Sequence, residues 1–264
     1  MSTVHAIHAE WTKLRTVAST PWLLLAAVAV TVGISAAATA AAGSRACPDP
    51  AACLDDLARL GLTGAQYGQA LVVVLAVLVI GEEYGTRSIG VSLAAVPGRW
   101  RLYLAKAVVL TGVVAAAGSL GVIGSLLAAR HFLPGTALGA ANPGQSLSPT
   151  AEPVLRAAYG TVLYLALVAL LSYGVAAVLR DTAGAIATML VLLYVAPILT
   201  SVVTDPRWLR RIDRIAPMSA GLKIQATTAL DSLTSSPWQG LGVLGLWAAG
   251  ALLAGLLALQ FRDA

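Results

Sequence analysis

Six long runs of apolar residues, separated by more polar segments, dominate the pattern of the chain. The runs are rich in Leu, Ala and Val, and they do not alternate in polarity as the strands of an outer-membrane barrel would. A helix needs about 20 mostly apolar residues to cross the hydrocarbon of a bilayer, where its backbone groups must bond to one another. The pattern predicts an all-α membrane protein with six transmembrane helices, near residues 21–42, 65–81, 106–129, 157–179, 183–203 and 240–260.

The composition agrees with this pattern along the whole chain. Of the 264 residues, 58% are apolar and only 11% are charged, whereas about a quarter of the residues in a soluble domain are charged. The net charge of +5 comes from basic residues scattered at the ends of the apolar runs, which favours contact with membrane lipids over nucleic acid. We interpret residues 1–264 as a single transmembrane domain.

The segment before the first run has the pattern of an amphipathic helix. Its apolar residues recur at helical spacing, with polar residues on the other side, so residues 1–20 are predicted to form a helix at the inner membrane surface. A signal peptide is the alternative, because AAATAAAG resembles a cleavage site, but the leader is long and the following run can span a bilayer. The residues assigned to the interfacial helix are Trp11, Lys13, Leu14 and Arg15.

The distribution of basic residues favours cytoplasmic termini. Six spans place both termini on one side, and the two sides carry nearly equal numbers of Lys and Arg, but the segments on the side of the termini are shorter. Cys47 and Cys53 then fall in the first outer loop, where an oxidising exterior would allow a disulfide. Two free thiols are the alternative. In the last outer loop, residues 207–215 show the pattern of a second amphipathic helix.

The stretch GEEYGTRSIG, directly after the second run, admits two interpretations. Its EExxxR spacing occurs in intramembrane metalloproteases, in which histidines from nearby spans hold the metal. The three histidines here are His5 and His8 in the leader and His131 after the third run, on the opposite side from Glu82 and Glu83. The sequence therefore favours neither a metal site nor a protease, and the acidic pair is better explained as a cytosolic docking corner.

The longer stretch GEEYGTRSIGVSLAAVPGRWRLYLAKAVVL has a recognisable organisation. An acidic span end leads into an amphipathic piece, a proline and a basic aromatic anchor. The chain resembles the permease subunit of type-2 ABC transporters, in which such a cytosolic segment joins the second and third spans. The order of leader, spans and loops extends the likeness over nearly the whole chain, although Gly85 and Arg87 depart from the common order of a basic residue and a glycine. The likeness is carried by Glu83, Tyr84, Ser88, Ile89, Leu93, Ala94, Pro97, Arg99, Arg101 and Lys106.

The resemblance implies a transport subunit and not an enzyme. The chain lacks the GxxxxGK[ST] nucleotide motif, so it is expected to hold no cofactor and to work with two copies of a cytosolic ATPase that bind ATP and Mg²⁺. A second permease copy or a paralogue would complete the transporter in the cell membrane, as in a bacterial inner membrane. Residues 86–96 would transmit movement of the ATPase to the spans. The residues expected to couple to the ATPase are Glu82, Glu83, Tyr84, Thr86, Arg87, Ile89, Leu93, Pro97 and Arg99.

The interiors of the predicted spans contain no Asp, Glu, Lys, Arg or His. Ion-coupled secondary transporters generally need such groups near the middle of the membrane, so that class is disfavoured. The same absence favours an apolar or amphiphilic cargo, and the family resemblance favours export.

Overall fold

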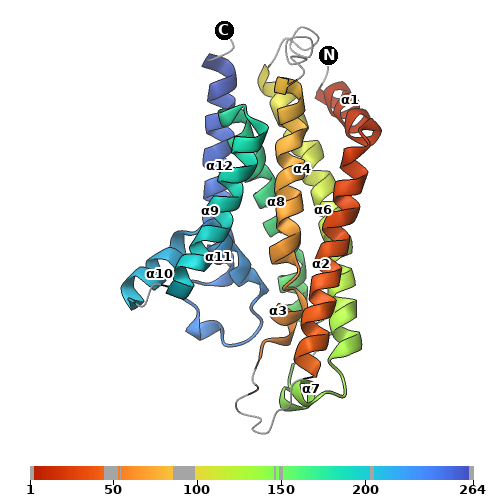
Figure 1. The fold of residues 1–264 in the computed structure, drawn as a ribbon, viewed down its shortest axis with the longest axis vertical. Coiled ribbons are helices and arrows are strands. Elements are labelled where there is room, and N and C mark those ends of the chain that lie inside the picture. Colours follow the sequence, from red (N-terminus) through yellow and green to blue (C-terminus); the bar gives the residue numbers. More distant parts are fainter. Residues whose placement is uncertain are drawn as a thin grey trace.

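The computed structural model describes residues 3–44, 53, 55–85, 99–145, 147–148, 151–202 and 205–261. Over these ranges the chain is helical and has no strands. The first helix and the end of the last helix lie at the same end of an elongated bundle, here called the terminal end, and the opposite end is called the distal end (Figure 1). The long elements are α1 (Thr3–Thr16), α2 (Ser19–Gly43), α4 (Ala65–Gly85), α6 (Arg99–Phe132), α8 (Glu152–Leu179), α9 (Thr182–Val202), α10 (Pro206–Ile215) and α12 (Pro237–Phe261). The short elements are α3 (Leu57–Gly61), α7 (Ala137–Ala141), α11 (Pro217–Gly221), η2 (Leu222–Gln225) and η3 (Leu230–Ser232).

Within the described ranges, five helices are long and apolar enough to cross a membrane: α2, α6, α8, α9 and α12. They coincide with five of the six predicted spans. The remaining predicted span, 65–81, is the second in the chain. It is also helical, as part of α4, but its apolar part falls in the class of shorter helices, with at most 17 residues. Such a helix rises about 25 Å, less than the roughly 30 Å of a bilayer core.

Helix α8 forms the centre of the bundle and packs against α4, α6 and α12. It is the most buried of the five long apolar helices, and Tyr164, Val168 and Tyr173 are fully covered. Close approach of the backbones contributes to this packing, since a Cβ built on Gly174 would lie 2.5 Å from the carbonyl carbon of Ala251 in α12. Small residues at helix contacts favour association in lipid, where burial of apolar surface contributes little.

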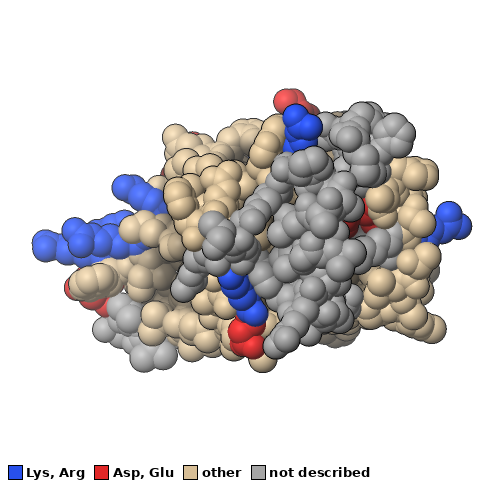
Figure 2. Space-filling view, turned by 90° about the horizontal axis from the view of Figure 1, so that it is seen from above, with Lys and Arg blue, Asp and Glu red and all other residues tan. Residues whose placement is uncertain are grey.

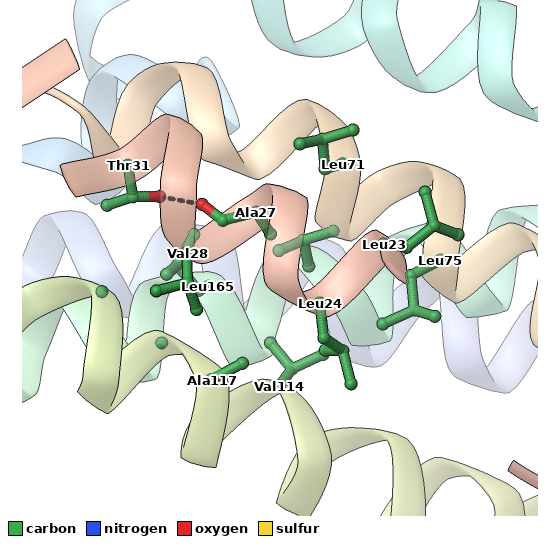
Figure 3. A pocket seen from close by; sticks show the side chains of 13 residues that line it. Leu23, Leu24, Ala27, Val28, Thr31, Leu71, Leu75, Val114, Ala117 and Leu165 are labelled. Atoms are coloured by element: carbon green, nitrogen blue, oxygen red, sulfur yellow. Dashed lines mark hydrogen bonds between the residues drawn. The ribbon is translucent and has the colours of Figure 1, made fainter. Parts of the chain in front are cut away.

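Helix α2 presents hydroxyl groups to α4 and α6 without leaving them unsatisfied. Thr31 donates to the carbonyl of Ala27 at 2.7 Å, and Ser35 accepts from the backbone N–H of Gly64 at 3.0 Å. Figure 3 shows the Thr31 bond beside a small cavity whose labelled side chains are otherwise apolar. The cavity volume is about 10 Å³, which is room for about one water molecule, so this space is a packing gap and not a ligand site.

Helix α9 contains Pro197 in its interior, and its outward face is exposed at Val191, Val195 and Ile198. This exposed apolar face is compatible with contact with lipid or with another membrane helix.

Candidate functional site

The predicted coupling corner lies at the terminal end of the bundle. Helix α4 continues through Glu82, Glu83 and Tyr84 to Gly85, and α6 begins at Arg99 at the same end (Figure 1). The side chains of these residues are outside the part that the structure describes. The same holds for all atoms of residues 86–98, including Thr86, Arg87, Ile89, Leu93 and Pro97.

The leader forms a helix of its own, α1, which ends at Thr16 before α2 begins at Ser19. The helix packs against α6, and Trp11 and Arg15 are exposed on it. Lys13 and Leu14 belong to α1, but their side chains are not described. The prediction of a separate leader helix is confirmed, while its position at a membrane surface stays a prediction.

A buried ion pair joins α1 to α6. The ammonium of Lys106 lies 2.6 Å from the Oε2 atom of Glu10, and the two side chains are only 3% and 10% exposed. Burying two charges is costly unless they are paired closely, so this contact fixes how α1 lies on α6. Lys106 is about two turns after the start of α6, and the pair therefore anchors the leader beside the coupling segment.

Sequence reasoning did not find this pair. In the sequence, Glu10 is one of the polar residues of the leader, and Lys106 stands at the start of an apolar run. The sequence does contain a signal for an ion pair, because an acidic residue near the start of the chain and a lysine at the start of an apolar run have opposite charges. Nothing in their spacing shows that they meet.

Two further contacts close the terminal end around α4, α8, α9 and α12. A Cβ on Gly81 of α4 would lie 2.5 Å from the hydroxyl oxygen of Thr182 at the start of α9. Arg180, in a left-handed conformation with φ 59°, ends α8 and donates from Nη2 to the carbonyl of Ala258 at 3.0 Å. A movement of the end of α4 would therefore be transmitted directly to α9.

To one side of the bundle, in its distal half, the predicted amphipathic segment 207–215 is confirmed as helix α10 (Figure 1). Its four arginines are exposed, as is Trp208. Viewed from above in Figure 2, Lys and Arg side chains project beyond the rest of the molecule on the side where Figure 1 places α10. The exposed arginines are Arg207, Arg210, Arg211 and Arg214.

Lys223, in the segment before the last predicted span, is buried and organises this distal region. Its ammonium lies 2.7 Å from the carboxylate of Asp213 in α10 and donates to the hydroxyl of Ser235 at 3.1 Å and to that of Thr234. These bonds connect α10, η2 and the segment before α12. The short elements between α9 and α12 therefore form an ordered cap and not a loose loop.

The first distal loop is attached to this cap by Asp56. The carboxylate caps α3 by accepting from the backbone of Arg59 at 3.0 Å, and it also accepts from the hydroxyl of Thr227 at 2.7 Å. Cys53, just before it, is disulfide-bonded, and Cys47 lies outside the described residues.

The geometry keeps His131 away from the acidic pair. His131 is in the last turn of α6, whose first turn begins at the end where α4 stops, and the 34 residues of α6 rise about 51 Å. In the ranges that the structure covers, no group of three or more His, Cys, Asp or Glu side chains is placed to hold a metal ion.

Comparison with models of known protein families and with curated protein sequences finds no match for this chain. The fold defines the class: an all-α, multi-pass membrane protein, with five helices in the described part of the chain that are long and apolar enough to cross a bilayer.

Proposed function

We propose that the chain is the permease subunit of an ATP-driven exporter in the cell membrane, as in a bacterial inner membrane. In this function a separate cytosolic ATPase, present in two copies, binds ATP and Mg²⁺ and docks on the corner between α4 and α6. A second permease copy or a paralogue completes the translocation path. The permease itself carries out no chemistry, and its cargo is apolar or amphiphilic.

The observation that carries the proposal is the convergence of α1, the end of α4 and the start of α6 at one end of the bundle. A segment tied to two long helices can pass rigid-body movement to both. The Glu10–Lys106 pair makes α1 part of the same unit, and the contact between Gly81 and Thr182 extends it to α9. A push on residues 86–96 would then tilt α4 and α6 together with α9.

Co-purification tests the class of protein. A tagged full-length chain, extracted from its native membrane in mild detergent, is expected to retain an ATPase with a Walker motif, detected by mass spectrometry and by ATP hydrolysis. Recovery of the intact chain without any such ATPase would reject the proposal. Labelling of the 86–98 segment from outside intact cells would reject it as well, because the ATPase works in the cytosol.

Reversing the acidic pair tests the corner. The double substitution Glu82→Lys and Glu83→Lys is expected to lower export about 10-fold or more while the chain still inserts and ATP is still hydrolysed. The reversed charge of the corner would repel the ATPase surface that the acidic pair is proposed to contact. Transport and ATP hydrolysis are measured side by side in proteoliposomes. The matched control is Glu152→Lys, an exposed residue in the first turn of α8 at the other end. Unchanged export in the double variant would remove the assigned role from this pair.

A further inference from the structure

A cavity of about 490 Å³ lies among the start of α4, the last part of α9 and the cap formed by α10, α11 and η2. Its volume is within the range of small-molecule sites, which is roughly 300–1,000 Å³. It differs from the small gap of Figure 3, whose one polar lining side chain is Thr31, in being larger and in having several polar side chains in its wall. The apolar wall includes Pro197, Leu209 and Met218, and the polar wall includes Gln66, Ser219 and Lys223.

The walls of this cavity are held in place from behind. The Sδ atom of Met218 accepts from Nε2 of Gln69 at 3.2 Å, and the carbonyl of Gln66 accepts from the hydroxyl of Tyr194 at 2.6 Å. Lys223 is fixed by its bonds to Asp213 and to two hydroxyls. The cavity is therefore largely preformed, which lowers the entropic cost of binding a ligand.

The charge of the cavity comes from Arg59. Lys223 and Asp213 neutralise each other, whereas Arg59 also lines the cavity, is exposed, and has no ion-pair partner among the residues that the structure describes. Its backbone is held by the Asp56 cap of α3 at 3.0 Å. A guanidinium in such a position binds phosphate or carboxylate oxygens by charge-assisted hydrogen bonds.

The surroundings indicate that the ligand also has an apolar part. Helix α10, which supplies Leu209 and Asp213 to the cavity, exposes Trp208 and Ile215 at 57% and 58%, together with its arginines. A helix of this kind lies at the level of lipid headgroups. At that depth a bound molecule meets water on one side and hydrocarbon on the other.

We propose that this cavity binds an anionic amphiphile, with its phosphate or carboxylate headgroup at Arg59 and the beginning of its apolar chain against Leu209 and Met218. The binding is a property of this chain alone. Its meaning as a site for cargo rests on the proposed function, since in an exporter this distal end would be the side of release, and the cargo would be an anionic amphiphile.

Binding to the purified full-length chain in a neutral detergent tests the site, with native mass spectrometry as the readout. The probe is oleoyl lysophosphatidate, and monoolein serves as the neutral amphiphile with the same chain. We expect Arg59→Gln to weaken binding of lysophosphatidate about 10-fold and to leave monoolein unchanged, because a hydrogen bond to a charged group is lost. The matched control is Arg210→Gln, an exposed arginine of α10 that does not line the cavity.

Two further arms make the outcome decisive. Ser219→Leu fills the cavity without changing its charge and should weaken binding of both amphiphiles. Inorganic phosphate at equal concentration should not displace lysophosphatidate, and displacement would assign the site to a free anion instead. Equal weakening by Arg59→Gln and Arg210→Gln would overturn the proposal in favour of general surface charge. Since no ATPase is present, failure of this test is distinct from failure of co-purification.

Discussion

Replacing Lys106 with methionine is expected to destabilise the protein by about 3–5 kcal/mol, because the Glu10 carboxylate then remains buried beside an apolar side chain. The two groups now lie 2.6 Å apart and are almost completely covered. Reversible unfolding of the detergent-solubilised chain measures the free energy of unfolding of each variant. The control is Arg15→Met, which removes an exposed charge from the same leader helix and is expected to change stability by no more than about 0.5 kcal/mol.

The double variant Glu10→Met with Lys106→Met separates stability from function. With both charges gone, most of the lost stability is expected to return, since apolar replacements for buried ion pairs are often neutral. If the ion pair is needed to hold α1 in the coupling unit, the double variant is expected to be stable but to transport less than the unmodified chain. A Lys106→Met variant that is as stable as the unmodified chain would show that the two charges are not paired in the membrane.

Substituting Gly174 with alanine is the second change with a large expected effect. The added Cβ would lie 2.5 Å from the carbonyl carbon of Ala251 and 2.7 Å from the backbone nitrogen of Leu252. Both are backbone atoms of α12 and cannot turn away as a side chain could, so α8 and α12 must separate. We expect the free energy of unfolding to fall by about 3 kcal/mol, which is the upper end of the usual cost of overpacking.

The matched control for this substitution is in the partner helix. Apart from its chain neighbours and the nearby backbone of α12 itself, Gly250 has no atom within 4 Å of an added Cβ. Gly250→Ala should therefore leave stability unchanged or raise it by up to about 1 kcal/mol, because alanine favours the helix. Unfolding measurements on both variants under one condition give the comparison. Equal effects of the two alanines would contradict the close contact between α8 and α12.

The apolar runs were sufficient to predict the helical architecture. Composition alone specifies which segments can be covered by lipid, and every predicted span is a helix. The ends were less predictable. Helix α6 was expected over 106–129 but occupies Arg99–Phe132, since RWRLYLA and RHF contain no helix breaker and hydropathy does not register polar helical turns.

Pairings between distant polar residues could not be predicted from one sequence. Lys223 lies in the segment before the last predicted span, where a lysine is normally exposed, yet Asp213 and Thr234 surround it in the folded chain. Glu10 and Lys106 are likewise joined only by the packing of α1 on α6. The coupling corner is the opposite case. The sequence predicts its residues, but their side chains lie outside the part of the chain that the structure describes.

The proline inside α9 has a mechanical consequence. Proline lacks an amide hydrogen, so the carbonyl of Leu193, four residues earlier, loses its usual partner in the helical ladder. The last turn and a half of α9 can therefore bend at a lower energetic cost than the rest of the helix. Because Pro197 and Thr200 border the distal cavity, its most compliant side is the one formed by α9, and a hinge there would widen or narrow the opening while the cap around Lys223 stays still.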